Sequence, residues 1–240
     1  MGRIAAIIPA AGLGTRMGAE MPKQFLELDG MPLLIFTLKR LAACPSITEF
    51  LIATRADGIA SLEERVAKAR IGQPVRVVPG GDTRQQSVAN ALAQVDPSTE
   101  IVLVHDAVRP FVTREQVERV IAEARARGAA ILGIPAIDTV KEVKRASLPE
   151  DVALISATIP RERIVLAQTP QVFAYALLRD ALRKAQEDDV NASDEAAAVE
   201  RFGHQVFVVL GSDRNLKITR PSDMDLARFY LEQERQMVKA

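Results

Sequence analysis

The sequence is poor in the residues that most often supply nucleophiles and metal ligands. It has one cysteine, Cys44, and two histidines, His105 and His204, among 240 residues. A lone cysteine excludes a disulfide framework and a multi-cysteine zinc site, and its apolar surroundings favour a core residue over a nucleophile. Neither a Gly-x-Ser-x-Gly turn nor a His-Glu-x-x-His helix is present. Chemistry that needs an activated nucleophilic side chain is therefore disfavoured.

The sequence also lacks an excess of charge and a long apolar run. Its 31 basic residues balance its 31 acidic residues, so no overall field attracts nucleic acid or an anionic membrane, and we expect neither as a partner. No apolar run approaches the roughly 20 residues that span a bilayer. The first apolar run breaks at Pro9, which does not match a secretory signal. We expect an unexported, cytoplasmic protein, in keeping with its single thiol.

What is present is a regular alternation of strand-like and helix-like segments. With 48% hydrophobic residues, the chain is long enough for one large α/β domain over residues 1–240. The alternation predicts parallel βαβ units with helices on both faces of the sheet. We expect strands at 4–9, 49–53, 75–79, 101–105, 130–135, 164–168 and 205–210, and helices at 32–43, 59–70, after 82 or 83, after 113, at 174–187, from 193 and after 221.

Residues 138–161 depart from this alternation. Two stretches of alternating character, 139–144 and 152–159, flank a polar turn that contains Pro149 and Asp151. This pattern predicts a β-hairpin that projects from the sheet. Such a hairpin could pack on its own subunit. Its exposed apolar positions Val152, Leu154 and Ile155 favour an arm that packs on a second copy, and hence a homodimer.

The first predicted strand runs directly into a glycine-rich loop. Gly12 and Gly14 are followed by Arg16 and, seven residues later, by Lys23. Glycines let backbone N–H groups approach an anion, and fixed cations neutralise its remaining charge, so the loop suits a phosphate. The spacing matches neither the P-loop nor the dinucleotide fingerprint, which has a third glycine where Met17 stands. A purely structural tight turn is the alternative.

Ligands of a parallel sheet bind beyond the carboxyl ends of its strands, and polar loops follow three further strands. Asp82 lies in one of these loops and suits either a helix cap or a ligand contact. His105 suits local packing better than catalysis, and Asp106 suits either role. The loops are Gly80-Gly81-Asp82-Thr83-Arg84 leading to Ser87, His105-Asp106-Ala107-Val108-Arg109-Pro110, and Gly211-Ser212-Asp213-Arg214-Asn215-Leu216-Lys217.

These loops supply cations rather than a general base. A phosphate monoester, with a second pKa of about 6, is already an oxyanion nucleophile at neutral pH. Its attack on a nucleoside triphosphate requires positioning and charge neutralisation, which arginines, lysines and a divalent metal provide.

The motifs, taken together, resemble nucleotidyltransferases of glycosyltransferase-A-like fold. More narrowly, they are similar to the 2-C-methyl-D-erythritol 4-phosphate cytidylyltransferases of the non-mevalonate isoprenoid pathway. The likeness implies a single Rossmann-like domain with a mostly parallel sheet and a projecting hairpin as dimerisation arm. The resemblance is carried by Pro9-Ala10-Ala11-Gly12-Leu13-Gly14-Thr15-Arg16-Met17, Pro22-Lys23-Gln24-Phe25, Gly80-Gly81-Asp82 with Ser87, Val104-His105-Asp106-Ala107-Val108-Arg109-Pro110, Pro135 with Asp138-Thr139-Val140-Lys141, Gln168-Thr169-Pro170-Gln171, Asp194-Glu195, and Lys217-Ile218-Thr219-Arg220-Pro221.

The resemblance implies a reaction of CTP with methylerythritol phosphate that gives 4-diphosphocytidyl-2-C-methyl-D-erythritol and pyrophosphate, with Mg²⁺. It implies that Arg16 and Lys23 stabilise the transition state, and that Arg161 and Lys217 position the acceptor phosphate. Implied nucleotide contacts are Ala10, Ala11, Gly12, Gly81, Asp82, Ser87, Asp106 and Ala107, and implied acceptor contacts are Asp106, Arg109, Thr139, Thr169 and Ser193.

The resemblance also bears on the metal, on the arm and on Ser193. The metal is expected to be held mainly by the triphosphate, with Asp106 as its candidate protein ligand. Thr139 and Arg161 would reach across from the partner's arm, so the active sites of the homodimer would be shared. Ser193 stands where the family pattern has threonine, and the hydroxyl is kept.

Other functions remain open at this point. A ribitol-5-phosphate cytidylyltransferase would share most of the loop residues, and a sugar-1-phosphate nucleotidylyltransferase would share the first loop. A catalytically silent nucleotide-binding module would usually have lost Arg16, Lys23 or Lys217, and all three are present.

Overall fold

A seven-stranded sheet forms the centre of the molecule. The computed structural model describes residues 2–12, 22–144, 149 and 151–239. Neighbouring strands pair in the order β11-β7-β10-β6-β1-β4-β5. All pairs are parallel except those of β10, which runs antiparallel to both β6 and β7. The predicted mostly parallel α/β sheet is confirmed; its strands are β1 (Ile4–Pro9), β4 (Glu49–Thr54), β5 (Val75–Pro79), β6 (Ile101–Val104), β7 (Ala129–Pro135), β10 (Val165–Ala174) and β11 (Phe207–Leu210).

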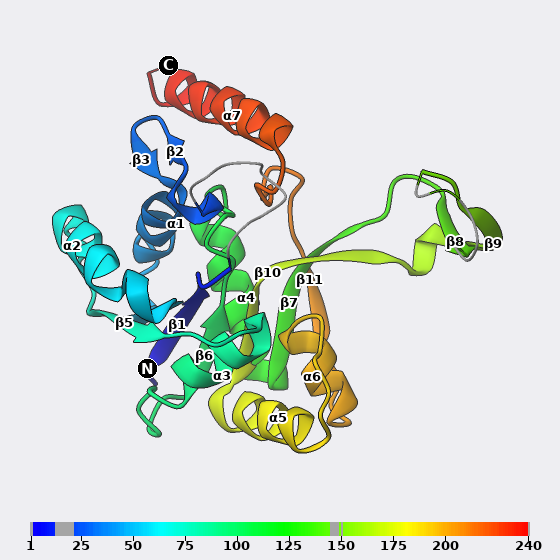
Figure 1. Ribbon diagram of the computed structural model, residues 1–240, viewed down its shortest axis with the longest axis horizontal. Coiled ribbons are helices and arrows are strands. Elements are labelled where there is room, and N and C mark those ends of the chain that lie inside the picture. The colour runs from blue at the N-terminus through cyan, green and yellow to red at the C-terminus, as the bar shows by residue number, and fades with distance from the viewer. Residues whose placement is uncertain (1, 13–21, 145–148, 150, 240) are drawn as a thin grey trace.

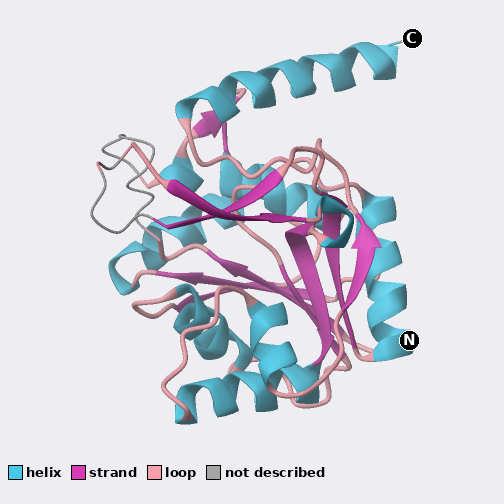
Figure 2. Cartoon of the chain, turned by 90° about the vertical axis from the view of Figure 1, so that its right-hand side faces the viewer, coloured by secondary structure: helices cyan, strands magenta, loops and turns pink. Residues whose placement is uncertain are grey.

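The central strand β1 is apolar on both sides because both faces of the sheet are covered. Ile4 and Ile8 enter one hydrophobic cluster, whereas Ala5 and Ile7 enter another on the opposite face. This explains its continuous apolar run, which is typical of buried parallel strands. Helices lie on either side of the sheet (Figure 2).

Two sets of helices complete the layers. The first face packs against α1 (Leu33–Ala42), α2 (Ile59–Ala69) and α4 (Arg114–Arg127), and the second against α3 (Arg84–Leu92), α5 (Tyr175–Glu187) and α6 (Glu195–Arg201). A third, smaller cluster joins α7 (Pro221–Lys239) to the short strand β2 (Glu27–Leu28). Strand β2 pairs with β3 (Met31–Pro32), and the sequence pattern predicted neither strand. No helix within the described part of the chain is long and apolar enough to cross a bilayer.

Strand β10 corrects one prediction. The expected strand ended at Gln168, but β10 continues to Ala174. Its register against β7 shifts between Ala167 and Gln171. A bulge is one of the few places in a sheet where proline is tolerated, and here it lets the strand pass Pro170.

Two helix starts also differ in detail. Of the two candidate caps of α3, Thr83 rather than Asp82 accepts the hydrogen bond from the backbone N–H of Gln86, in a capping box. Helix α6 begins at Glu195, capped by Asp194, and not at Ser193. In both places the residue whose side chain reaches the third N–H of the helix becomes the cap.

The predicted hairpin projects from the body of the molecule, as Figure 1 shows at the right. Strands β8 (Val140–Lys144) and β9 (Leu154–Ile159) pair antiparallel in a separate two-stranded sheet. The side chains of Val152, Leu154 and Ile155 are 45%, 64% and 57% exposed. A two-stranded hairpin with exposed apolar residues is marginal by itself in water.

Candidate active site

A pocket of about 240 Å³ opens at the carboxyl ends of β1 and β6. This is where ligands of open α/β sheets bind. It brings together all eight residues that the resemblance assigned to the nucleotide, and also Lys23 and Lys217. The described residues that line it are Pro9, Ala10, Ala11, Gly12, Lys23, Gln24, Gly81, Asp82, Thr83, Arg84, Ser87, Asp106, Ala107, Val108 and Lys217.

The first wall continues β1 and is held by Gln24. The side-chain amide of Gln24, which is buried, donates to the carbonyl of Ala10 at 2.7 Å and to that of Gly12 at 3.2 Å. Gln24 and Lys23 share the short 3₁₀ helix η2 (Lys23–Phe25), so fixing one places the other. Arg16 lies outside the described residues.

The second wall is the turn between β5 and α3. A Cβ at Gly80 would lie 2.9 Å from both the Cβ of Ala11 and the hydroxyl of Ser87, so glycine is needed for the two walls to meet. The Ser87 hydroxyl accepts from the N–H of Gly81 at 3.0 Å and donates to the carbonyl of Thr83 at 2.9 Å. Ser87 therefore shapes the turn from below, since it is 2% exposed.

Asp106 is a buried carboxylate in the pocket. One of its carboxylate oxygens, Oδ2, lies 2.9 Å from Lys217 Nζ and 3.3 Å from Arg109 Nε, and Oδ1 lies 3.5 Å from an Arg84 nitrogen. Burial alone would raise the pKa of this carboxyl, but Lys217, Arg84 and Arg109 outweigh it and hold the pKa well below its usual range. The carboxylate is ionised at every physiological pH.

A relay of hydrogen bonds beneath the pocket fixes the position of Asp106. The hydroxyl of Thr169 accepts from the Asp106 N–H at 3.0 Å and lies 3.0 Å from His105 Nδ1. His105 Nε2 lies 3.1 Å from the carbonyl of Arg109, which can only accept, so in the neutral ring Nε2 carries the proton and Nδ1 accepts from Thr169. Burial lowers the pKa of His105 to about 4, so the ring stays neutral and structural.

Sequence reasoning gave no role to two charged residues at this site. Arg84 lines the pocket, and its guanidinium bridges Asp106 and the buried Glu195, whose Oε1 lies 2.6 Å from an Arg84 nitrogen. Both residues stand in motifs described above: Arg84 ends the Gly80-Gly81-Asp82-Thr83-Arg84 loop, and Glu195 follows Asp194. Only the fold brings them together, because they are 111 positions apart.

Five residues assigned to the acceptor or to catalysis are not among the described residues that line the pocket. Arg109 and Thr169 lie behind Asp106 and hold it, while Ser193 is exposed before α6. Thr139 is exposed beside β8. Arg161, in η4 (Arg161–Arg163), is exposed and donates to the carbonyl of Ile137 at 2.6 Å.

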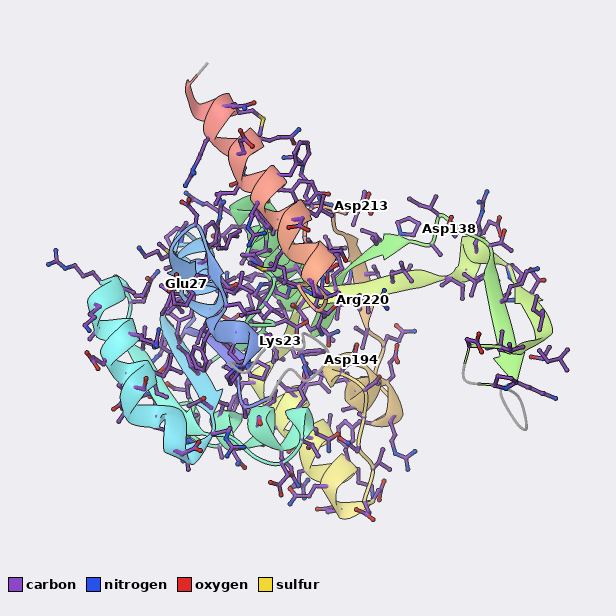
Figure 3. The ribbon with its side chains drawn as sticks, turned by 45° about the horizontal axis from the view of Figure 1, so that its top comes forward. Lys23, Glu27, Asp138, Asp194, Asp213 and Arg220 are labelled. Carbon is purple, nitrogen blue, oxygen red and sulfur yellow. The ribbon has the colours of Figure 1, made fainter. Side chains whose placement is uncertain are left out.

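The arm therefore does not bring its polar residues to the pocket of its own chain. Figure 3 places Asp138, which directly precedes Thr139, on the arm, apart from Lys23 in the body of the molecule.

The pocket does not provide a metal cage of its own. Among the described residues, no group of three or more His, Cys, Asp or Glu side chains is placed to hold an ion. Two carboxylates line the described pocket, those of Asp82 and Asp106. This donor set fits a magnesium ion, which is usually bound through one or two carboxylates and the phosphates of a substrate.

Comparison with known proteins identifies the relatives of the chain. Residues 4–233 match the family profile of 2-C-methyl-D-erythritol 4-phosphate cytidylyltransferase. Proteins of that name from Acidobacterium capsulatum and Solibacter usitatus are 50% and 48% identical, over 96% and 97% of this chain and 98% and 97% of theirs. The crystal structure of 4-diphosphocytidyl-2C-methyl-D-erythritol synthase from Anaerococcus prevotii superposes with a TM-score of 0.82 at 30% identity, covering 96% of this chain and 99% of that one.

Proposed function

Because the chain belongs to the 2-C-methyl-D-erythritol 4-phosphate cytidylyltransferase family, we infer that it joins CTP to 2-C-methyl-D-erythritol 4-phosphate. The products are 4-diphosphocytidyl-2-C-methyl-D-erythritol and pyrophosphate. The observation that carries this function is the pocket itself, in which two glycine-rich walls meet a carboxylate shared by Lys217, Arg109 and Arg84. Such a site binds a nucleotide on one side and an anionic acceptor on the other.

The reaction needs no side chain as nucleophile. An oxygen of the acceptor phosphate attacks the α-phosphorus of CTP, and the bond from that phosphorus to the oxygen bridging it to the β-phosphate breaks. Pyrophosphate leaves with the electron pair. The attacking phosphate is an oxyanion near pH 7, so no proton has to be removed. The neutral, buried His105 plays no part as a base.

The cations of the pocket supply the catalysis. Negative charge accumulates on the equatorial oxygens of the α-phosphate during the attack, and fixed cations stabilise it. This role is assigned to Lys23, at the pocket wall, and to Arg16, four residues after Gly12 in the sequence. The nucleotide is assigned to Ala10, Ala11, Gly12, Gly81, Asp82, Ser87, Asp106 and Ala107.

The acceptor is assigned to the side of Asp106 opposite the nucleotide. Lys217, whose side chain is 39% exposed at the pocket, can turn from Asp106 to the acceptor phosphate. This side is completed by Asp106, Arg109, Thr169 and Ser193. Arg109 and Thr169 act through their contacts with the Asp106 carboxylate and its N–H. Thr139 and Arg161 would arrive from the arm of a second copy, in a homodimer with shared active sites.

Magnesium fits this arrangement, held mainly by the triphosphate with Asp106 as the candidate protein ligand. When bound, it would neutralise the charge of the triphosphate and of the departing pyrophosphate. We place the reaction in the cytoplasm, where the free and buried thiol of Cys44 suits a reducing environment.

Pyrophosphate release tests the function directly. CTP would be mixed with methylerythritol phosphate or with ribitol 5-phosphate in parallel reactions, and each would be repeated with UTP. We expect release with CTP and methylerythritol phosphate, and a much smaller specificity constant for ribitol 5-phosphate and for UTP. A faster reaction with ribitol 5-phosphate would contradict the assigned acceptor. Equal specificity constants for CTP and UTP would contradict the assigned nucleotide.

A further inference from the structure

Glu195 is a charged residue in a place where a charge is costly. Its side chain is 1% exposed, and its atom Oε2 has no hydrogen-bond partner in the described part of the molecule. Burial raises the pKa of Glu195 against the opposing effect of Arg84. Burial of a carboxylate with one unpartnered oxygen lowers the stability of the fold, and the ion pair with its partner offsets only part of this cost.

That partner is Arg84, which lies in the pocket wall. Its strong contact is with Glu195 Oε1 at 2.6 Å, whereas its contact with Asp106 Oδ1 is 3.5 Å long. The backbone of Arg84 is fixed as well, since it is the first residue of α3, directly after the Thr83 cap. A guanidinium carries five N–H donors, so these contacts leave donors for the pocket.

Asp106 connects this pair to the reaction. In the structure its charge is shared by Lys217, Arg109 and Arg84. When Lys217 turns to an acceptor phosphate, Asp106 loses the shortest of these three contacts. Arg84 and Arg109 must then keep the carboxylate in place, and Arg109 is already held by the carbonyl of Asn215 at 2.7 Å.

We propose that Glu195 is a positioning residue of the transfer reaction: it holds Arg84 against Asp106, so that Asp106 stays in place when Lys217 moves to the acceptor phosphate. Glu195 acts through Arg84 and does not touch the substrates. The proposal rests on the proposed function and refines its acceptor side.

Glu195→Gln keeps the shape of the side chain and removes its charge. We expect kcat/KM for methylerythritol phosphate to fall about tenfold, because a hydrogen bond between charged groups is lost. Most of the change should lie in KM for the acceptor, and the dissociation constant of CTP should stay within about twofold. A parallel loss of CTP affinity would overturn the proposal, because it would place the pair on the nucleotide side.

The matched control is Glu49, a buried glutamate that also has an oxygen without a hydrogen-bond partner. It is 7% exposed, pairs with Arg76 at 3.0 Å, and lies at the start of β4, at the opposite end of the sheet from the pocket. Glu49→Gln should lower the melting temperature without changing kcat/KM. If both variants reduced kcat/KM equally at the same loss of stability, Glu195 would be merely structural.

A double-mutant cycle tests whether Glu195 acts through Arg84. In an Arg84→Gln background, Glu195→Gln should change kcat/KM by no more than about twofold, because the group it positions is gone. A full tenfold effect in that background would contradict the proposal.

A measurement without substrate separates this proposal from the proposed function. The NMR signals of the Arg84 guanidinium, identified by their loss in Arg84→Lys, should be slowly exchanging in the wild type and in Glu49→Gln. They should exchange fast in Glu195→Gln. Persistent slow exchange in Glu195→Gln would refute the positioning role whatever the acceptor. Failure of the wild type to use methylerythritol phosphate would instead refute the function.

Discussion

The pocket and the arm differ in which groups they bury: the pocket buries charged side chains, and the arm exposes apolar ones. Charged groups at the pocket are buried and paired within one chain, as in the network of Asp106, Arg109 and Lys217. In the described part of the arm, two strands carry exposed apolar side chains such as Leu154, and none of their residues belongs to a hydrophobic core cluster. Such an arm is stable only if it packs on something. The difference supports the proposal that the arm of one copy packs on a second copy and reaches its pocket.

The largest effect is expected from the two cations assigned to the transition state. Lys23→Ala and Arg16→Ala should each reduce kcat by at least about a hundredfold, the range seen when one stabiliser of transition-state charge is removed. CTP binding should weaken far less. Steady-state kinetics and a CTP titration would measure both, with circular dichroism to confirm folding. An unchanged kcat in a folded variant would exclude the residue from this role.

A smaller effect is expected from the arm. In the double variant Leu154→Asp/Ile155→Asp, two charges replace side chains that are 64% and 57% exposed. Dimers should dissociate, and kcat/KM for the acceptor should fall about tenfold or more as the contact from Arg161 is lost, while CTP binding stays. Sedimentation velocity and kinetics would follow the two effects.

Met237→Asp is the control for the arm variant. Met237 is also an exposed apolar residue, 62% exposed, but it lies in α7, away from the arm (Figure 1). It should leave both the oligomeric state and the activity unchanged. A monomeric arm variant with full activity would show that the arm is dispensable for catalysis.

The pH dependence of stability distinguishes the pocket floor from the surface. Burial lowers the pKa of His105 from 6.5 to about 4, so the unfolded chain binds the proton more tightly than the folded one. The contribution of the neutral, buried His105 ring to the free energy of unfolding is fully present above pH 6.5 and is lost as the pH falls towards 4. The loss is about 3 kcal/mol. Glu195, whose pKa is raised, acts in the opposite sense over acidic pH.

The difference in unfolding free energy between the wild type and His105→Gln isolates the histidine from the carboxyl groups. The difference should shrink as the pH falls from 6.5 to 4. His204→Gln is the control, because His204 is exposed. A difference for His105→Gln that does not vary with pH would show that the ring is not buried in its neutral form.

The sheet and the nucleotide walls could be predicted from local patterns. The buried run of β1, the glycines at Gly80 and Gly81, and the alternation of elements all act through neighbouring residues. The course of β10 could not be predicted, because the bulge that accommodates Pro170 depends on pairing with β7. The caps at Thr83 and Asp194 were ambiguous because several adjacent residues had suitable side chains.

The charged network was harder to predict than the walls. Arg84, Asp106, Glu195 and Lys217 come from four separate segments, and only the folded sheet brings them together. Sequence reasoning placed Asp106 and Lys217 at the site but missed the pairing of Arg84 with Glu195. Thr169 was assigned to the acceptor, and the structure adds its hydrogen bonds to Asp106 and His105.

The most direct test of shared active sites mixes two impaired proteins. Arg16→Ala lacks a cation assigned to the transition state, and Arg161→Ala lacks a group of the arm. After subunit exchange, each mixed dimer has one site with both defects and one with neither. We predict that pyrophosphate release in the mixture rises well above the mean of the two separate variants. If exchange is demonstrated and the rate stays at that mean, Arg161 serves the pocket of its own chain, and the account of a shared site is wrong.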